Sequence, residues 1–169
     1  MNQTSSTQSS STRGRIAAIS ASWHSAIVHR ARDAFLSELQ RHGRDADEVD
    51  LIDVPGAFEI PLLARRLALT GRYEAIAAFG LVVDGGIYRH DFVAHAVIDG
   101  LMRVQLDTGT PVISAVLTPH FFHEHDEHRR YFGDHFVIKG TEAAQALLRT
   151  IDLHQGHPAV AIDPLGRGC

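Results

Sequence analysis

The stretch 75-AIAAFGLVVDGGIYRHDFV-93 decides the fold of this chain. Residues 75–83 form a nearly continuous apolar run, which is typical of a central parallel strand covered on both faces. A turn containing Gly85 and Gly86 follows, and apolar residues then recur at helical spacing over residues 92–104. A buried strand followed by a tight turn and a helix is the repeating unit of an open α/β sheet.

The rest of the chain repeats this alternation. Apolar runs predict three more strands, at residues 15–20, 49–54 and 112–117. Periodicity predicts further helices over residues 24–42, 60–69, 123–131 and 142–153, with an apolar segment at 136–140 between the last two. The sequence therefore predicts a doubly wound α/β domain over residues 14–155, with a four-stranded parallel sheet flanked by helices. Residues 1–13 are expected to be a disordered tail and residues 156–169 a loose one.

Composition excludes several classes of protein. The formal net charge of −4 argues against a nucleic-acid binder, which would carry a basic stripe. No apolar run approaches the length of a membrane span, and the polar start of the chain does not read as a signal peptide. The single cysteine, Cys169, allows no internal disulfide, so we expect a reducing, cytoplasmic location.

Aromatic and polar side chains follow the first two predicted strands. Right-handed crossovers place the carboxyl ends of all four strands on one edge, where ligands bind in such sheets. Trp23, after the first strand, is either a partly buried tryptophan or a plate on which a planar ring stacks. Glu59, beside Phe58 after the second strand, is either a helix-start acid or a hydrogen-bond acceptor for such a ring.

The glycine turn after the third strand carries the remaining polar groups. Gly85 and Gly86 form either a simple tight turn or a phosphate cradle of backbone amides at a helix start. Arg89 adds a fixed positive charge, and His90 adds a group that titrates near neutral pH. Asp91 is expected to cap the helix. This edge therefore predicts a site for a planar heterocycle and an anion.

A histidine-rich segment, with His120, His123, His125 and His128, raises the question of a metal site. Its spacing does not match the H-E-x-x-H pattern, because Glu127 stands four residues after His123. We therefore expect a polar surface helix and no metal.

The motifs together resemble the lumazine synthase family over residues 15–153. The resemblance rests on G-A-F-E-I-P at residues 56–61, the glycine turn before Asp91, and Lys139-Gly140. It implies a flavodoxin-like fold, pentamers with the active site between neighbouring subunits, and no cofactor. It also implies condensation of 5-amino-6-(D-ribitylamino)uracil with 3,4-dihydroxy-2-butanone 4-phosphate to give 6,7-dimethyl-8-ribityllumazine, phosphate and water.

Eight residues correspond by position to those that hold the pyrimidine and its ribityl chain in that family: Trp23, Ala57, Phe58, Glu59, Leu81, Val82, Val83 and Ser114. Trp23 stands where the family stacks an aromatic on the ring. Ser114 stands where the family usually has an aromatic contributed by the neighbouring subunit. The same resemblance implies that the phosphate of the butanone is bound by Gly86, Ile87 and His128.

The catalytic position departs from the usual family pattern. Arg89 aligns with the general acid/base histidine, and His90 follows one place later. We interpret Arg89 as an electrostatic partner of phosphate, because a guanidinium stays charged, and His90 or water as the proton carrier. The segment GGIYRHDFV resembles a divergent second type of lumazine synthase that assembles as a dimer of pentamers. A flavin- or lumazine-binding paralogue, acting as a carrier or store, is the alternative.

Overall fold

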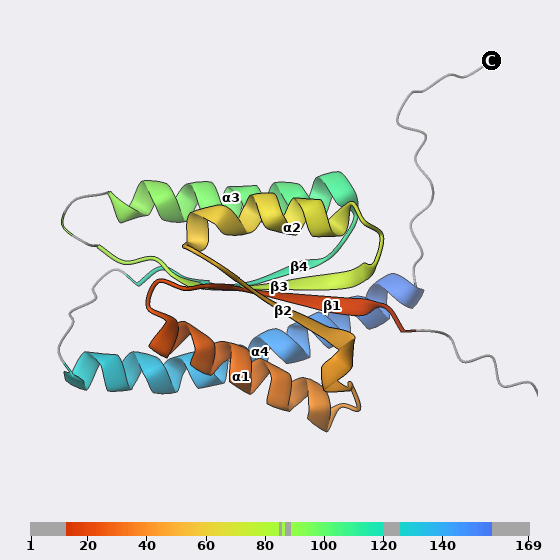
Figure 1. Ribbon diagram of the computed structural model, residues 1–169, viewed down its shortest axis with the longest axis horizontal. Coiled ribbons are helices and arrows are strands. Elements are labelled where there is room, and N and C mark those ends of the chain that lie inside the picture. Colours follow the sequence, from red (N-terminus) through yellow and green to blue (C-terminus); the bar gives the residue numbers. More distant parts are fainter. Residues whose placement is uncertain (1–12, 85, 87–88, 120–125, 157–169) are drawn as a thin grey trace, which may run out of the picture.

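The sheet has four parallel strands in the order β2-β1-β3-β4. The computed structural model describes residues 13–84, 86, 89–119 and 126–156, with the backbone alone for residues 126–132 (Figure 1). The strands are β1 (Arg15–Ala21), β2 (Val49–Val54), β3 (Tyr73–Leu81) and β4 (Val112–Leu117). β1 pairs with both β2 and β3, and β3 also pairs with β4, so β1 and β3 are the central strands, as the apolar run at residues 75–83 predicts for β3.

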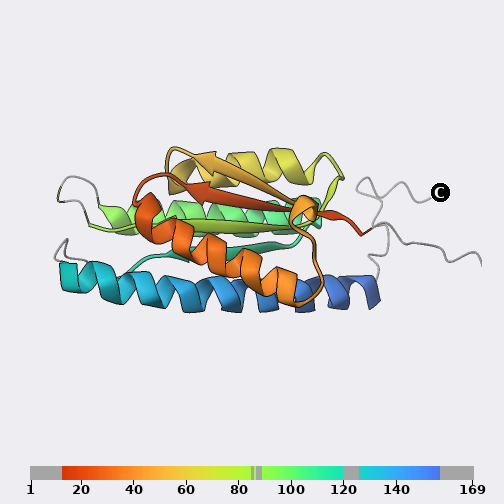
Figure 2. The ribbon, with the colours of Figure 1, turned by 60° about the horizontal axis from the view of Figure 1, so that its bottom comes forward.

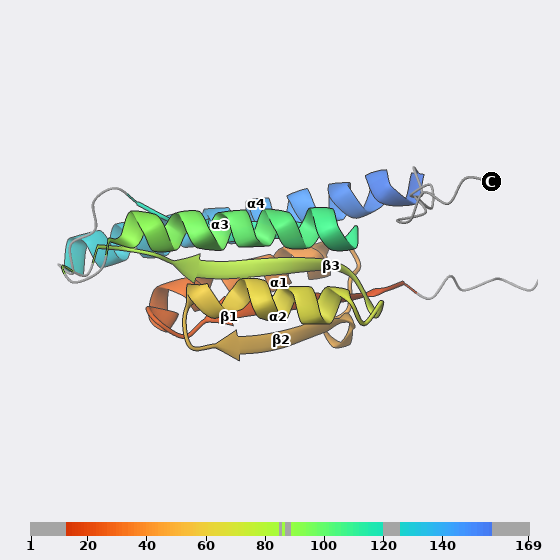
Figure 3. The same ribbon diagram turned by 90° about the horizontal axis from the view of Figure 1, so that it is seen from above.

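Four helices cover the two faces of the sheet. They are α1 (Ser25–Arg41), α2 (Ile60–Ala68), α3 (His90–Thr108) and α4 (Asp126–Gly156), with short 3₁₀ turns η1 (Ala46–Glu48) and η2 (Ala57–Glu59). α1 and α4 lie on one face (Figure 2), and α2 and α3 lie on the other (Figure 3). The predicted doubly wound α/β fold is confirmed. No helix in the described ranges is long and apolar enough to cross a membrane.

Each face of the sheet has its own hydrophobic core, because side chains alternate along a strand. On β1, Ile16 and Ala18 point into the core shared with α1 and α4, whereas Ala17 and Ile19 point into the core shared with α2 and α3. In the first core the rings of Phe35 and Phe79 meet edge to face, with centroids 5.2 Å apart. Because the strands are parallel and packed between these two cores, the carboxyl ends of all four strands lie at one edge of the sheet.

The structure corrects two predictions about the helices. The described part of the segments predicted as separate helices, at 123–131 and 142–153, is one continuous helix, α4, and residues 123–125 lie outside the described residues. Gly140 does not break α4 but lets it touch α1, since a Cβ on Gly140 would lie 2.0 Å from the carbonyl oxygen of Ala31. Asp91 is also not the cap of α3, because Arg89 occupies that position and Asp91 lies in the first turn.

Candidate functional site

A cavity of about 230 Å³ lies at the carboxyl edge of the sheet. The loop after β1 contributes Trp23 and His24, and η2 contributes Ala57 and Phe58. The end of β3 contributes Leu81, Val82 and Val83, and α3 contributes His90 and Val93. Seven of the residues assigned to the site from the sequence therefore lie together, although they come from four separate segments.

Trp23 lies over Gly56 and beside Glu59. A Cβ on Gly56 would lie 3.0 Å from Cε3 of Trp23 and 3.1 Å from Oε2 of Glu59, so only glycine allows this approach without a shift. The same carboxylate oxygen accepts the backbone N–H of Gly56 at 2.9 Å. Glu59 therefore holds the loop in place, and its role as a hydrogen-bond acceptor for a ligand stays a prediction. Trp23 and Phe58 remain 67% and 61% exposed, which leaves aromatic surface open to a planar ligand.

His24 lines the cavity and was not assigned to the site from the sequence. It adopts a left-handed backbone conformation, with φ 58° and ψ 32°, and it is the only residue other than glycine with positive φ in the described ranges. Its carbonyl oxygen accepts the N–H groups of Ile27 and Val28 at 2.9 and 3.0 Å. The sequence signal for it was its position between Trp23 and the first helix.

Arg89 directly precedes His90 in the sequence and does not line the cavity. Its guanidinium pairs with Asp91 at 3.2 Å and stacks over the ring of Phe92, with Cζ 4.4 Å from the ring centroid. Partial desolvation opposes ionisation of Asp91, but the hydrogen bond and charge of Arg89 outweigh it, so the pKa of Asp91 lies below its ordinary value. Arg89 thus offers charge from outside the cavity, whereas His90 lines it.

The glycine turn carries its own acceptor. Gly86 has φ 74°, and its N–H donates to Oδ1 of Asp84 at 2.8 Å. A phosphate bound by this amide, as proposed from the sequence, would have to displace that carboxylate. Gly85 and Ile87 lie outside the described residues.

Ser114 does not line the cavity. Ser114 lies on the edge strand β4, where it is exposed, and its hydroxyl accepts the N–H of Val116 at 3.3 Å. The side chain of His128 lies outside the described residues, as do His120, His123 and His125. No cluster of three or more metal-ligating side chains occurs among the residues that the structure describes.

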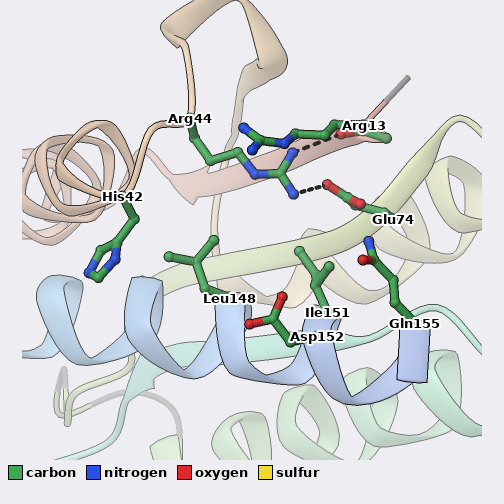
Figure 4. Close-up of a pocket in the computed structure, with 9 residues that line it drawn as sticks. Arg13, His42, Arg44, Glu74, Leu148, Ile151, Asp152 and Gln155 are labelled. Carbon is green, nitrogen blue, oxygen red and sulfur yellow. Dashed lines mark hydrogen bonds and ion pairs between the residues drawn. The ribbon is translucent and has the colours of Figure 1, made fainter. Parts of the chain in front are cut away.

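A second and larger cavity, about 470 Å³, lies at the other end of the sheet between β1, β3 and α4. Arg44 is 6% exposed and pairs there with Glu74, and it also donates to the carbonyl oxygen of Gly14 at 3.4 Å. Figure 4 shows the Arg44 guanidinium pointing toward Glu74, with Asp152 across the cavity on α4. No Phe, Tyr or Trp side chain lines this cavity among the described residues, and its buried Arg44 is paired within the fold. We therefore place the candidate site at the carboxyl edge.

The fold and this cavity define an α/β protein that presents an aromatic ligand site at the carboxyl ends of its parallel strands. Residues 13–155 match the family model of 6,7-dimethyl-8-ribityllumazine synthase. The chain belongs to that family.

Three curated relatives illustrate the similarity. The chain is 68% identical over 137 residues to a 6,7-dimethyl-8-ribityllumazine synthase of Rhodococcus erythropolis, covering 81% of this chain and 88% of the relative. It is 51% identical over 138 residues to a 6,7-dimethyl-8-ribityllumazine synthase 2 of Pseudomonas syringae pathovar tomato, covering 82% and 81%. A synthase 2 of Bradyrhizobium diazoefficiens is 55% identical over 137 residues, covering 81% and 82%. The resemblance noted from the sequence is therefore confirmed, including its likeness to proteins named as the second type.

Proposed function

We propose that this chain is a lumazine synthase of riboflavin biosynthesis, which condenses 5-amino-6-(D-ribitylamino)uracil with 3,4-dihydroxy-2-butanone 4-phosphate. The observation that carries the proposal is the cavity that joins the exposed Trp23 ring to His90 at the edge of the sheet. Membership of the family supports the same reaction, and the relatives are named as synthases, which gives no support to a carrier or store.

The proposed mechanism assigns each side of the cavity one task. The pyrimidine stacks on Trp23, and backbone groups of residues 81–83 read its edge. The primary amine of the uracil adds to the ketone and loses water to form an imine, and phosphate is then eliminated. The ribityl-bearing amine closes the ring on the remaining carbonyl with loss of a second water, while the His90 imidazole takes up and returns protons. Arg89, from outside the cavity, attracts the phosphate of the butanone. Alignment of two reactive partners supplies most of the acceleration.

The test is to mix purified protein with both substrates and to follow the fluorescence of the lumazine product. We expect product formation above the rate in buffer, and none when either substrate is omitted. A His95→Asn variant serves as the control, because His95 is an exposed histidine on α3 outside the cavity. A protein that binds riboflavin but forms no lumazine above the buffer rate would contradict the enzymatic proposal.

We further propose that the chain assembles from pentamers, most simply as a dimer of pentamers. Ile98, Met102 and Leu106 recur every fourth residue on α3 and are 40%, 51% and 73% exposed, so they leave an apolar stripe on that helix. The exposed Ser114 on the edge strand supports a site completed by a neighbouring copy. A second chain that covers the stripe would remove these side chains from water.

Sedimentation velocity tests the assembly. We expect one species with the mass of ten chains of 18.5 kDa each, and dissociation of it in a Leu106→Glu variant, which puts a charge in the stripe. An exposed Leu153→Glu variant on α4 is the matched control. A monomer at micromolar concentration would rule out the shared site.

A cytoplasmic location is also proposed. It rests on the single cysteine of the sequence, which permits no internal disulfide and suits a reducing compartment.

A further inference from the structure

The cavity at the amino end of the sheet has a volume of about 470 Å³, and the proposed reaction makes no use of it. It is lined from the segment before β1 by Arg13 and Gly14, from the loop before β2 by Arg44, and from the start of β3 by Glu74. The last turns of α4 form the other side. Cavities of this volume are typical of small-molecule sites, so the chemistry of the walls indicates which ligand would fit.

One wall of the cavity is cationic. Arg13 donates to the carbonyl oxygen of Gly43, the neighbour of Arg44, at 2.9 Å. Arg44, which is almost fully buried, donates in turn to the carbonyl oxygen of Gly14 at 3.4 Å and pairs with Glu74. Each arginine is therefore bonded to the residue next to the other, which keeps the two close together. A guanidinium carries more N–H donors than these bonds use, so this wall keeps donors for an anionic group.

The opposite wall is one stripe of α4. Four residues at helical spacing line the cavity there (Figure 4): Leu148, Ile151, Asp152 and Gln155. Leu148 and Ile151 provide apolar surface. Asp152 and Gln155 are exposed, and their side chains have no hydrogen-bond or ion-pair partner among the residues that the structure describes. This wall therefore presents an unpaired carboxylate beside an apolar floor.

Opposite charges thus face each other across this cavity without meeting. No ion pair joins Asp152 to Arg13 or Arg44 in the described part of the chain. A plain anion bound to the arginines would lie near the carboxylate of Asp152, and a plain cation bound to Asp152 would lie near two guanidinium groups. A ligand with an anionic group at one end and a cationic group at the other would satisfy both walls.

From this complementarity we propose that the cavity is a second ligand site, for a small zwitterion of the ω-amino acid type. The carboxylate of the ligand binds the guanidinium groups of Arg13 and Arg44, and its ammonium group binds Asp152. Its methylene chain covers Leu148 and Ile151. The site goes beyond the proposed function and does not depend on it. Because the ligand joins α4 to the segments before β1 and β2, its binding also stabilises the folded domain.

Isothermal titration calorimetry of the full chain with the series from 3-aminopropanoate to 6-aminohexanoate tests the site. We expect one member to bind about tenfold more tightly than the alkanoate and the alkylamine of the same chain length, since each analogue lacks one charge-assisted contact. The same member should raise the melting temperature of the protein, and the two analogues should raise it less.

Two substitutions locate the ligand, and both change exposed side chains, so the fold is retained. Asp152→Asn should weaken binding of the zwitterion about tenfold and leave binding of the alkanoate intact, whereas Arg13→Gln should weaken both. Asp134→Asn, which changes an exposed carboxylate on the same helix outside the cavity, is the matched control and should bind the zwitterion normally. Trp23→Ala, at the carboxyl edge, should also bind it normally.

Three results would overturn the inference. An alkanoate that binds as tightly as every ω-amino acid would indicate a simple anion site. Unchanged affinity for the zwitterion in Asp152→Asn, or reduced affinity in Trp23→Ala, would place the ligand elsewhere. Absence of binding by the whole series would leave the cavity without this ligand class. None of these results bears on lumazine synthesis, which the assay with both substrates measures separately.

Discussion

The cavity at the carboxyl end of the sheet is lined mostly by apolar and aromatic side chains, whereas the cavity at the amino end is lined by several charged side chains. Trp23, Phe58 and a strained His24 surround the first cavity. Around the second, Arg44 is held by Glu74 and by the carbonyl oxygen of Gly14. The carboxyl end carries exposed aromatic side chains and a strained backbone. Both features are unfavourable for the stability of the fold, and both are typical of a ligand site. At the second end the buried Arg44 is paired within the fold, so this end stabilises the fold.

The largest expected effect comes from removing the Arg44–Glu74 ion pair at the amino end of the sheet. Glu74→Ala leaves the buried Arg44 without its main carboxylate, so we expect the free energy of unfolding to fall by about 3 kcal/mol. Urea denaturation measures this loss, and riboflavin affinity at the other end should be retained. The exposed pair Arg30–Asp134 provides the control, since Asp134→Ala should cost well under about 1 kcal/mol. An equal cost for both variants would mean that the buried pair has no special role.

The next effect comes from removing the aromatic plate at the carboxyl end. Trp23→Ala should weaken binding of riboflavin by about 1–3 kcal/mol, because the ring loses its stacking partner. Isothermal titration calorimetry measures the affinity without relying on the lost tryptophan. Phe92→Ala, an exposed aromatic outside the cavity, should bind riboflavin normally. Unchanged affinity in Trp23→Ala would remove Trp23 from the site.

A third prediction, at the carboxyl end, distinguishes the roles of the adjacent residues Arg89 and His90. His90→Ala should lower kcat about tenfold or more and flatten the pH–rate profile between about pH 6 and 8, since its imidazole lines the cavity and is the group proposed to carry the proton. Arg89→Ala should mainly raise the KM for the butanone phosphate, because its guanidinium lies outside the cavity. If both variants keep the original pH profile, neither side chain carries the proton.

The smallest effect concerns Asp50, on β2. Hydrogen bonds from Arg15 and from the Tyr73 hydroxyl lower the pKa of Asp50 to about 2, against an ordinary value of 3.8. Asp50 is a third exposed, so solvent screens this pair, and we expect it to contribute only about 1 kcal/mol. Because the folded pKa is the lower one, the contribution is present above about pH 4 and lost as the pH falls toward 2.

Denaturation at several pH values between about 2 and 5 checks this prediction. Asp50→Asn should lose this part of the pH dependence, whereas Asp33→Asn, an exposed carboxylate paired with the adjacent Arg32, should keep it. An Asp50→Asn variant with the original pH dependence would show that the cluster does not stabilise the fold.

Much of the fold can be predicted from the sequence, because helices and strands with a buried face carry apolar residues at a regular spacing. The apolar run at 75–83 and the alternating strands and helices predict the sheet, and the rule that parallel strands end at one edge gathers Trp23, Phe58 and His90. The continuity of α4 does not follow, because Gly133 and Gly140 look like breaks in a sequence. In the structure they are close approaches of α4 to Arg30 and Ala31.

Other features of the two ends could not be predicted from one sequence. Arg44 and Glu74 are thirty residues apart and follow no period, so nothing local marks them as a pair. The left-handed conformation of His24 depends on how β1 enters α1 beside the loop after β2. Arg89 and His90 are adjacent in the sequence, and only the start of α3 determines that His90 lines the cavity while Arg89 points to Asp91 and Phe92.

The strand order β2-β1-β3-β4 also has a consequence for how the chain reaches this fold. Each strand after the first pairs with a strand that precedes it in the sequence, so the sheet can form in the order in which the strands are synthesised. The α2 and α3 face is complete once β4 has been made, whereas the other face lacks α4 until the end. A nascent chain that stops before α4 therefore exposes Phe35 and Phe79, and synthesis of this last helix completes the folding of the domain.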